Sequence, residues 1–277
     1  MSPEGFTVFS QELHYDESIR AIESFADAPR RKELHARISE ALPYSSYTTR
    51  DRVATKIIQR YFVNPDGTFP AAAFLKMVSA QKSDEVRRDL IYWRAARTDP
   101  LIEAVAGELF HAYFVLGKIP QGYGEPEFHM LNTATLFSVD SVITRDFAIE
   151  YARRVWGFDS PRTIALALRI MRQAGILDTI SVTLGRRRVH GYYPLPHIPR
   201  PEVFAYCICE EFLSESLLIS TDRLRNSAFA KVFLLSGLQM DSLAKAAEKK
   251  RLLAADGRYW RLVHGSLGEL VEALGGA

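Results

Sequence analysis

The sequence predicts a mainly α-helical protein that also contains a few small β-hairpins. Apolar residues recur at spacings of three and four over most of the chain, as they do in helices that bury one face. Strand-like stretches rich in β-branched and aromatic residues occur in two places, each beside a glycine that favours a turn. Helices should therefore form the body of the protein, with the strands added as short hairpins.

The composition is typical of a soluble globular protein that is large enough for two domains. The chain has 277 residues, of which 47% are hydrophobic and 25% are charged. Its N-terminus lacks a basic segment followed by an apolar run, and its most apolar stretch, residues 101–117, contains two glutamates and a histidine. Cys207 and Cys209 are too few for a disulfide framework. We therefore expect a cytoplasmic protein that does not span a membrane.

The first third of the chain predicts a helical domain. Thr48 or Thr49 is expected to cap one of its helices, on which Val53, Ile57 and Tyr61 share a face. The expected helices cover residues 16–42 with a break at Pro29, 45–62, 70–81, 84–97 and 101–116. A loop rich in glycine and proline follows at residues 117–127. We therefore assign residues 1–124 to an N-terminal helical domain.

The pattern changes after this loop. Residues 142–158 predict a helix that stops near Gly157. Ser160 is expected to cap the next helix by accepting a hydrogen bond from its first turn, and Pro161 suits the first helical position. That helix should end at residues 174–175, with Gly175 in the left-handed conformation.

This second helix is amphipathic and has a strongly basic outer face. At about 100° per residue, its apolar positions gather on one side. They are Ile164, Leu168 and Met171. The opposite side carries Arg162, Arg169, Arg172 and Gln173.

A β-hairpin is predicted directly after the basic helix. Residues 176–184 alternate in polarity, Gly185 turns the chain, and residues 187–195 return until two prolines end the strand. The turn region carries three consecutive arginines, Arg186, Arg187 and Arg188. This part of the sequence has the order of a winged helix, which is a helix-turn-helix with an appended hairpin. The order is a helix, a short break, an amphipathic helix, a glycine and a hairpin. We assign residues 125–200 to this unit.

A winged helix of this kind predicts binding to double-stranded DNA. If the basic helix enters a major groove, its arginines face phosphates or guanine edges, and the hairpin brings the other arginines to the flanking backbone. The predicted DNA-binding residues are Arg162, Thr163, Arg169, Arg172, Gln173, Arg186, Arg187 and Arg188. Arg50, Arg52, Lys56 and Arg60 are weaker candidates. The same pattern also occurs in domains that bind proteins, so a structural role of this unit is the alternative to DNA binding.

Residues 201–277 predict a linking helix followed by a second winged-helix-like unit. Residues 221–237 and 238–256 indicate two helices, with Asp241 as the N-cap of the second. Asp256 and Gly257 are a strong hairpin signal. Basic residues gather late in the second helix, at Lys245, Lys249, Lys250 and Arg251.

Charge is segregated along a chain whose net charge is only +2. Residues 151–190 hold eight arginines against two aspartates, and residues 220–263 hold nine Lys/Arg against four Asp/Glu. The stretches 101–150 and 191–219 are acidic. Basic blocks suit a polyanionic partner, because each neutralised phosphate releases counterions. Solvated helix faces are the alternative explanation of any one block.

No motif for catalysis, for a cofactor or for a metal ion is evident. Phosphate-binding glycine-rich loops are missing, and no Ser/His/Asp arrangement stands out. Cys207 and Cys209 follow His190 and His197, but their spacing does not fit a zinc module and their neighbours are apolar. We interpret both cysteines as buried core residues and expect a protein without enzymatic activity, cofactor or metal.

Three stretches match a known pattern: "FTVFS" at residues 6–10, "SYTTRDRVATKIIQRYF" at residues 46–62 and "SPRTIALALRIMRQAGILD" at residues 160–178. In these stretches the chain resembles the BrxA family, small accessory proteins of BREX anti-phage systems. The resemblance covers residues 6–178, and the C-terminal continuation departs from it. It implies a cytoplasmic, non-enzymatic DNA-binding protein with winged-helix-like parts, encoded beside phage-defence genes. It carries over no catalytic residue.

The function that we expect is therefore binding of double-stranded DNA as a component of a bacterial phage-defence system. A scaffold subunit that binds other defence proteins is the alternative, motivated by the acidic and aromatic-rich residues 101–137. An RNA-binding subunit of a CRISPR-type assembly is a third possibility.

Overall fold

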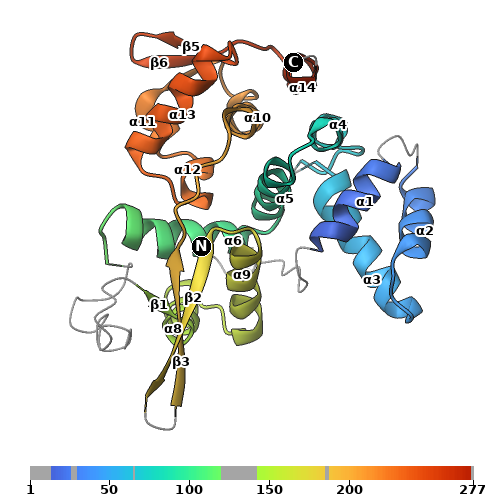
Figure 1. Cartoon of the computed structure of the whole chain (residues 1–277), viewed down its shortest axis with the longest axis vertical. Helices are drawn as coiled ribbons and strands as arrows, with labels where there is room; N and C mark the ends of the chain where they lie inside the picture. Colours follow the sequence, from blue (N-terminus) through green and yellow to red (C-terminus); the bar gives the residue numbers. More distant parts are fainter. Residues whose placement is uncertain (1–13, 26–29, 65, 120–141, 185–186, 276–277) are drawn as a thin grey trace. The chain divides into compact units, whose positions relative to one another are not determined.

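The computed structural model describes residues 14–25, 30–64, 66–119, 142–184 and 187–275, and the side chains of residues 182–189 lie outside that description (Figure 1). The described part of the chain is mainly helical and contains two small antiparallel sheets. It divides into two compact units. The first takes its described residues from Asp99–Ile198 and Asp222–Ser242, and the second from Gln11–Thr98, Pro199–Thr221 and Leu243–Ala277.

The N-terminal helices belong to the second unit. They are α1 (Tyr15–Phe25), α2 (Arg31–Ala41), α3 (Tyr47–Ile57), the π-helical turn η2 (Ile58–Phe62), α4 (Ala72–Ala80) and α5 (Asp84–Thr98). The shared face of Val53, Ile57 and Tyr61 is buried, as predicted. The expected cap at Thr48 or Thr49 is wrong: Ser46 caps α3, because its hydroxyl accepts a hydrogen bond from the Thr49 amide at 3.4 Å.

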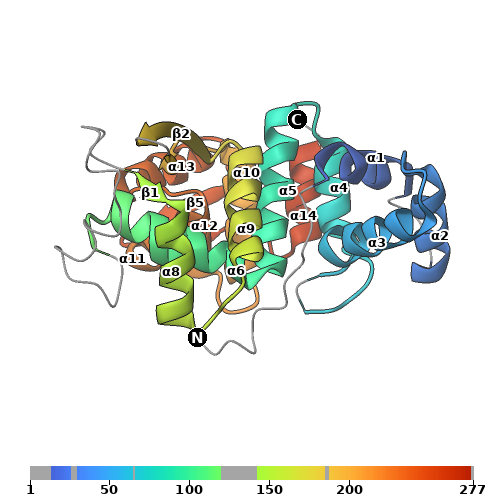
Figure 2. The ribbon, with the colours of Figure 1, turned by 90° about the horizontal axis from the view of Figure 1, so that it is seen from below.

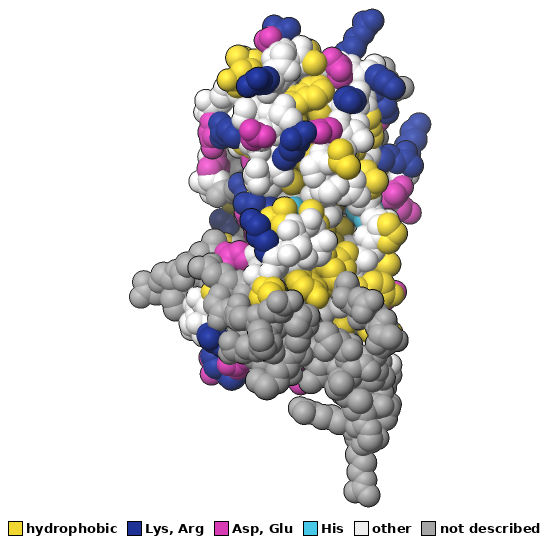
Figure 3. Space-filling view, turned by 90° about the vertical axis from the view of Figure 1, so that its left-hand side faces the viewer, with side chains coloured by type: hydrophobic (Ala, Val, Ile, Leu, Met, Phe, Trp, Pro, Cys, Tyr) yellow, Lys and Arg dark blue, Asp and Glu magenta, His cyan; other side chains and the backbone are white. Residues whose placement is uncertain are grey.

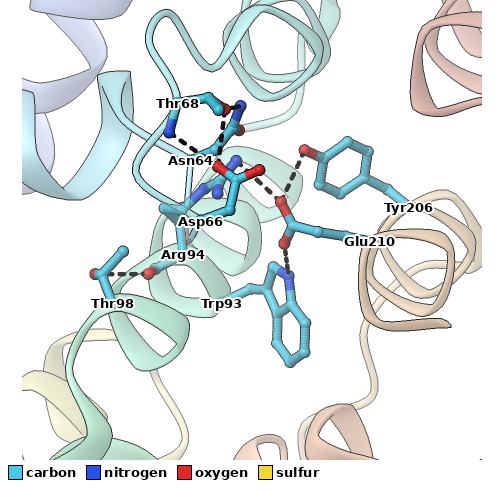
Figure 4. A network of polar contacts seen from close by, with 8 residues as sticks. All are labelled: Asn64, Asp66, Thr68, Trp93, Arg94, Thr98, Tyr206 and Glu210. Carbon is cyan, nitrogen blue, oxygen red and sulfur yellow. Dashed lines mark hydrogen bonds and ion pairs between the residues drawn. The ribbon is translucent and has the colours of Figure 1, made fainter. Parts of the chain in front are cut away.

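A buried ion pair joins α5 to α10 (Pro201–Phe212) inside the second unit (Figure 4). The Glu210 carboxylate accepts hydrogen bonds from the Trp93 indole N–H at 2.6 Å and the Tyr206 hydroxyl at 3.3 Å, and it forms an ion pair with Arg94 Nη2 at 2.9 Å. The Arg94 side chain is fully buried and its guanidinium lies 4.4 Å from the centre of the Phe74 ring. Two helices that are distant in sequence are thereby held together at one point.

The rest of the second unit combines a helix with a three-stranded sheet. The helix α14 (Leu267–Gly275) packs against α4 and α10. The strands are β4 (Leu218–Ser220), β5 (Leu253–Asp256) and β6 (Tyr259–Leu262), in the order β4-β6-β5. Ile219 and Trp260 are paired across the sheet and buried, whereas Tyr259 is exposed. The interpretation of Cys207 and Cys209 as core residues is confirmed, since both are buried in α10.

The first unit begins with α6 (Pro100–Ala104), which continues as the π-helical segment η3 (Val105–Val115). Asp99 caps α6 by accepting a hydrogen bond from the Leu101 amide at 3.2 Å. The unit continues with β1 (Ile143–Thr144), α8 (Arg145–Trp156), α9 (Pro161–Gln173), β2 (Leu177–Leu184) and β3 (Arg187–Pro194). It also contains most of α11 (Thr221–Arg225), α12 (Ala228–Val232) and the start of α13 (Gly237–Lys249).

The region around α11 to α13 differs from the prediction in two respects. Residues 221–237 do not form one helix: α11 ends at Arg225, and Ser227 caps α12 by accepting a hydrogen bond from the Ala230 amide at 3.1 Å. Asp241 is not the N-cap of α13. Ser236 caps it, and Gln239 reaches back to the Ser236 amide at 2.8 Å in a capping box. Asp241 instead forms an ion pair with Arg225.

In the part of the chain that is described, no helix combines the length and the apolar character needed to cross a bilayer.

Candidate nucleic-acid interface

The helix α8 is set in place by a strand that precedes it. Val142, Ile143 and Thr144 are buried, and Ile143–Thr144 forms β1, so the prediction of a continuous helix from residue 142 is wrong at its start. Thr144 has an extended conformation and its hydroxyl accepts from the Phe147 amide at 3.1 Å, which caps α8. The predicted stop is confirmed: α8 ends at Trp156, and Gly157 has a φ of 63°.

An aromatic anchor holds the far end of α8 against η3. The Trp156 indole N–H donates to Glu108 at 2.7 Å, and only 2% of Trp156 is exposed. The Tyr151 ring packs edge-on against it, with the ring centroids 5.1 Å apart. A buried indole whose N–H is satisfied fixes both the position and the rotation of a helix. The position of α8 in turn sets where α9 begins.

Ion pairs and hydroxyl contacts shape the turn between α8 and α9. Arg153 forms ion pairs with Asp159 at 3.1 Å and with Glu150 at 3.0 Å. The hydrogen bond and the charge of Asp159 raise the pKa of the Arg153 guanidinium. Pro161 occupies the first turn of α9, as predicted. The predicted cap by the Ser160 side chain is wrong, because its hydroxyl pairs with the Thr163 hydroxyl at 2.7 Å instead of receiving a backbone amide.

The helix α9 buries its apolar face and exposes its basic face. The buried residues are Ile164, Ala167, Leu168, Ile170 and Met171. The exposed residues, which we call the α9 basic face, are Arg162, Arg169, Arg172 and Gln173. Helix α9 packs against α8 and α6, and α8 and α9 stand side by side in Figure 2. Arg162 and Arg172 form no ion pair with any residue that the structure describes, so their charges are available to a ligand.

A glycine turn carries the chain from α9 into the hairpin. Gly175 has a φ of 76°. The Gly175 amide donates to the Arg172 carbonyl at 3.0 Å, and the Ile176 amide donates to the Met171 carbonyl at 3.0 Å. The predicted left-handed glycine is therefore confirmed. Strands β2 and β3 then pair in register from Leu177 with Pro194 to Leu184 with Arg187. In Figure 1 this hairpin projects beyond α8 and α9.

The strand β1 closes the sheet on the other side of β3, giving the order β1-β3-β2. Thr144 pairs with Gly191, and Ile180 of β2 pairs with the same glycine. A Cβ atom at position 191 would lie 3.0 Å from the Val142 side chain. Only glycine leaves room here for the chain that enters β1.

The predicted DNA-binding residues divide into three groups. Arg162, Arg169, Arg172 and Gln173 lie exposed on one helix face, and Thr163 is half-buried beside Ser160. Arg186 lies outside the described residues. Arg187 and Arg188 belong by their backbone to β3, where Arg188 pairs with Thr183, and their side chains are outside the description.

One of the weaker candidates is excluded. Arg50, Arg52 and Lys56 lie on α3 and are at least partly exposed, whereas Arg60 is 1% exposed within η2. Arg60 therefore cannot contact a nucleic acid while the second unit is folded. The predicted surface of residues 101–137 is described only over residues 101–119, and most of residues 101–111 are buried, which does not fit a surface there. Residues 120–137 lie outside the described part.

Comparisons with known proteins give no match. No family model matches the chain, and neither does any curated protein or any solved structure. The interface must therefore be judged on its own geometry and charge.

Among the described residues, no group of three or more His, Cys, Asp and Glu side chains is arranged to hold a metal ion. Burial raises the pKa of Cys207 well above its usual value and that of Cys209 to about 12. Thiols held in the protonated form are poor nucleophiles and poor metal ligands.

The sequence-based prediction missed β1 and the role of Gly191. Valine, isoleucine and threonine at residues 142–144 are a β-branched run, which was the available signal. The run is too short to stand out beside the helical pattern that follows it. Its partner, β3, lies more than forty residues further along the chain.

Proposed function

We propose that this protein is a non-enzymatic double-stranded DNA-binding protein, and that β1, α8, α9, β2 and β3 form a winged-helix unit that contacts the duplex. The observation that carries the proposal is the α9 basic face, on the helix between a short turn and an antiparallel hairpin. In helix-turn-helix proteins the second helix lies in the major groove and its exposed side chains meet bases and phosphates.

The strand order supports this assignment. A strand leads into the first helix, the second helix leads into a hairpin, and the first strand pairs with the far strand of that hairpin. This arrangement attaches the hairpin to the body of the unit through the pairing of β1 with β3. Three consecutive arginines lie in the sequence of the hairpin turn and the following strand, at residues 186–188. The hairpin would then act as the wing.

The charges support a polyanionic ligand. Arg162 and Arg172 form no ion pair among the described residues, whereas Arg153 of the preceding helix is paired twice. Basic side chains without intramolecular partners can neutralise phosphates without first breaking an ion pair, and each neutralised phosphate releases counterions from the DNA. The arginines that face away from the core are thus those best suited to DNA.

The biological setting that we propose is bacterial phage defence. It rests on the resemblance of residues 6–178 to the BrxA family and on the DNA-binding surface proposed above. Partners in such a setting would be double-stranded DNA and other defence-system proteins.

The test is a duplex-binding titration of the full chain at several salt concentrations. Arg162→Glu combined with Arg172→Glu should weaken binding by about tenfold or more and lower the slope of log K against log salt. The matched control is Lys76→Glu combined with Lys82→Glu, which changes the net charge equally at exposed residues of the other unit. Equal binding by the α9 variant and its parent would refute the assignment of α9 as the contact.

A protein-binding scaffold is the second candidate, and one observation favours it. Large apolar side chains are exposed on and beside the β4-β6-β5 sheet: Leu217, Leu218, Tyr259 and Val263, each at least 43% exposed. Exposed apolar patches often mark protein contacts. Co-purification with a defence protein that resists nuclease and moderate salt, from a chain that does not bind duplex DNA, would favour the scaffold over the DNA-binding protein.

A further inference from the structure

The C-terminal sheet repeats the strand arrangement of the proposed winged helix. In the proposed winged helix, β1 leads into α8, α9 leads into the β2–β3 hairpin, and β3 pairs with β1. In the C-terminal part, β4 leads into α11, α13 leads into the β5–β6 hairpin, and β6 pairs with β4. The orders are β1-β3-β2 and β4-β6-β5. The helix before the second hairpin is α13, which corresponds to α9 by its place in this order.

The two helices also end in the same backbone motif. After α9, the amides of Gly175 and Ile176 donate to the carbonyls three and five residues before them. After α13, the amides of Arg251 and Leu252 donate to Glu248 at 2.8 Å and Ala247 at 2.9 Å, with the same spacing. Residue 175 has a φ of 76° and residue 251 a φ of 60°, so both are left-handed.

An arginine therefore stands where the first motif has glycine. A left-handed conformation is strained for a residue with a side chain, and glycine is the usual choice at this point of a helix end. Such strain is typically retained where a side chain has a function. The Arg251 side chain is exposed and makes no ion pair with a described residue, so no contact within the described chain accounts for its presence.

Further cations without partners lie on the same helix and at the hairpin turn. Lys245 and Lys249 are one turn apart on α13 and exposed, opposite the buried Leu243, Ala244 and Ala247. Arg258 is exposed in the turn between β5 and β6. None of these three has an ion pair among the described residues, whereas Lys250 is paired with Glu202. Figure 3 shows Lys and Arg side chains at several points over the C-terminal elements.

We propose that Lys245, Lys249, Arg251 and Arg258, the C-terminal basic cluster, form a second binding surface for the phosphate backbone of double-stranded DNA. The proposal shares with the proposed function the premise that the ligand is duplex DNA. It adds a site that is separate in sequence from the α9 basic face. Its members are two lysines, whose ammonium groups are point charges on flexible stems, and two arginines, of which Arg251 has a left-handed backbone conformation. Such groups suit phosphates, which position a protein on the duplex, more than base edges.

Two carboxylates that follow or precede these cations in the chain, Glu248 and Asp256, offset part of their charge without cancelling it. Glu248, the acidic residue in the last turns of α13, accepts a hydrogen bond from the Ala255 amide at 3.2 Å and so serves the junction between helix and sheet. Asp256 lies at the end of β5 and has no ion pair with a described residue. Four cations against these two carboxylates leave an excess of two positive charges, and each phosphate that a cation neutralises would release counterions from the duplex.

The decisive variant is Arg251→Gly in the full chain. It removes one charge and relieves the backbone strain, so it should raise the midpoint of thermal unfolding by about 2–4 °C. At the same time it should weaken duplex binding about two- to fivefold and reduce the slope of log K against log salt by about 0.9. A variant that is more stable yet binds less cannot owe its loss to unfolding. If the affinity for the duplex does not change, Arg251 is not part of the proposed binding surface.

The helix and the turn are tested together by Lys245→Gln, Lys249→Gln and Arg258→Gln in one chain. We expect binding to fall by about tenfold or more with a salt slope smaller by about 2–3, and the circular dichroism spectrum to stay unchanged. The matched control replaces Lys32, Lys76 and Lys82, which are exposed elsewhere in the same unit, by glutamine. An equal loss in the control would show that only net charge matters and would overturn the proposal.

Failure of this proposal is distinguishable from failure of the proposed function. If the parent does not bind duplex DNA, both fail. If the Arg162→Glu, Arg172→Glu variant loses binding and the triple glutamine variant does not, only the second surface is refuted. If both surfaces bind DNA independently, the Arg162→Glu, Arg172→Glu variant should keep a residual, salt-sensitive affinity for the duplex. Adding the three glutamine substitutions to that variant should abolish this residual affinity.

Discussion

At the scale of single residues, the second unit depends on a charge that is buried at some cost. The Arg94 guanidinium has an ion-pair partner, Glu210, but none of its three nitrogens makes a hydrogen bond to a described residue. The Phe74 ring provides the remaining favourable contact. A buried pair of this kind adds little net stability while it is intact, but removing one partner leaves the other charge uncompensated.

Glu210→Gln should therefore destabilise the fold strongly. We expect the free energy of unfolding to fall by about 3–5 kcal/mol, because Arg94 keeps its charge and loses its counterion. Denaturant titration followed by circular dichroism measures the change. The double variant Arg94→Met, Glu210→Leu should recover a large part of the loss. If the double variant is less stable than Glu210→Gln, the pair itself is what stabilises the unit.

At the scale of elements, the helix ends show what the sequence can and cannot specify. Gly157 and Gly175 were predictable, because a left-handed helix end almost requires glycine at such a position. The hydroxyl caps were not, because several Ser, Thr and Asp residues compete at each start. Ser46 and Ser236 cap where neighbouring residues were expected to, and Ser160 pairs with Thr163 instead. The choice depends on the direction in which the chain enters each helix.

The sheet of the proposed winged helix offers a test at this scale. Gly191→Ala would place a methyl group 3.0 Å from Val142 Cγ2 and 3.4 Å from Ile180 Cγ2. We expect a loss of about 1–3 kcal/mol from overpacking, measured by thermal or denaturant unfolding. Val142→Ala in the same chain should restore part of it, and the double-mutant cycle measures the coupling. If the two substitutions change the free energy of unfolding additively, the side chains at positions 191 and 142 are not in contact.

A buried histidine gives η3 a pH-dependent stability. The His111 Nε2 donates to the Leu235 carbonyl at 3.1 Å, and only 4% of the residue is exposed. Burial lowers the pKa of His111 below its ordinary value of 6.5, and the nearby Lys231 lowers it further, while the hydrogen bond to Leu235 opposes them. The unfolded chain therefore takes up a proton at a higher pH than the folded chain does.

The free energy of unfolding should decrease on acidification, between the ordinary pKa of histidine and the lowered pKa of His111. Above pH 6.5 the contribution of His111 is fully present, and it is lost as the pH falls from about 6.5 to the lowered pKa of the folded state. Each unit of lowering corresponds to about 1.4 kcal/mol. The free energy of unfolding, measured between pH 7 and pH 5, should depend less on pH in His111→Gln. Parallel curves for parent and variant would assign the dependence to other groups.

At the scale of the whole molecule, sequence patterns predicted local elements far better than they predicted partners. The helical body and both hairpins follow from periodicity and turn residues. The pairing of β1 with β3, of β4 with β6 and of α5 with α10 joins segments forty or more residues apart, and no local pattern encodes such contacts. The candidate site shows the same division. The basic face of α9 was predictable, whereas the repeated strand order that points to α13 required the sheets to be seen.

The distribution of charge, and not its total, should decide DNA binding. The net charge is only +2, yet unpaired cations gather on α9 and around the end of α13. Arg162→Glu with Arg172→Glu lowers the net charge by four, and Glu40→Lys with Glu272→Lys, at exposed positions on α2 and α14, raises it again by the same amount. Because screening limits each charge to about 8–10 Å, lysines outside the proposed contact surfaces should not replace lost phosphate contacts. The compensated chain should bind a short duplex as weakly as the uncompensated one at 0.1 M salt. Recovery to the parental affinity would show that a diffuse attraction, and no defined surface, holds the DNA.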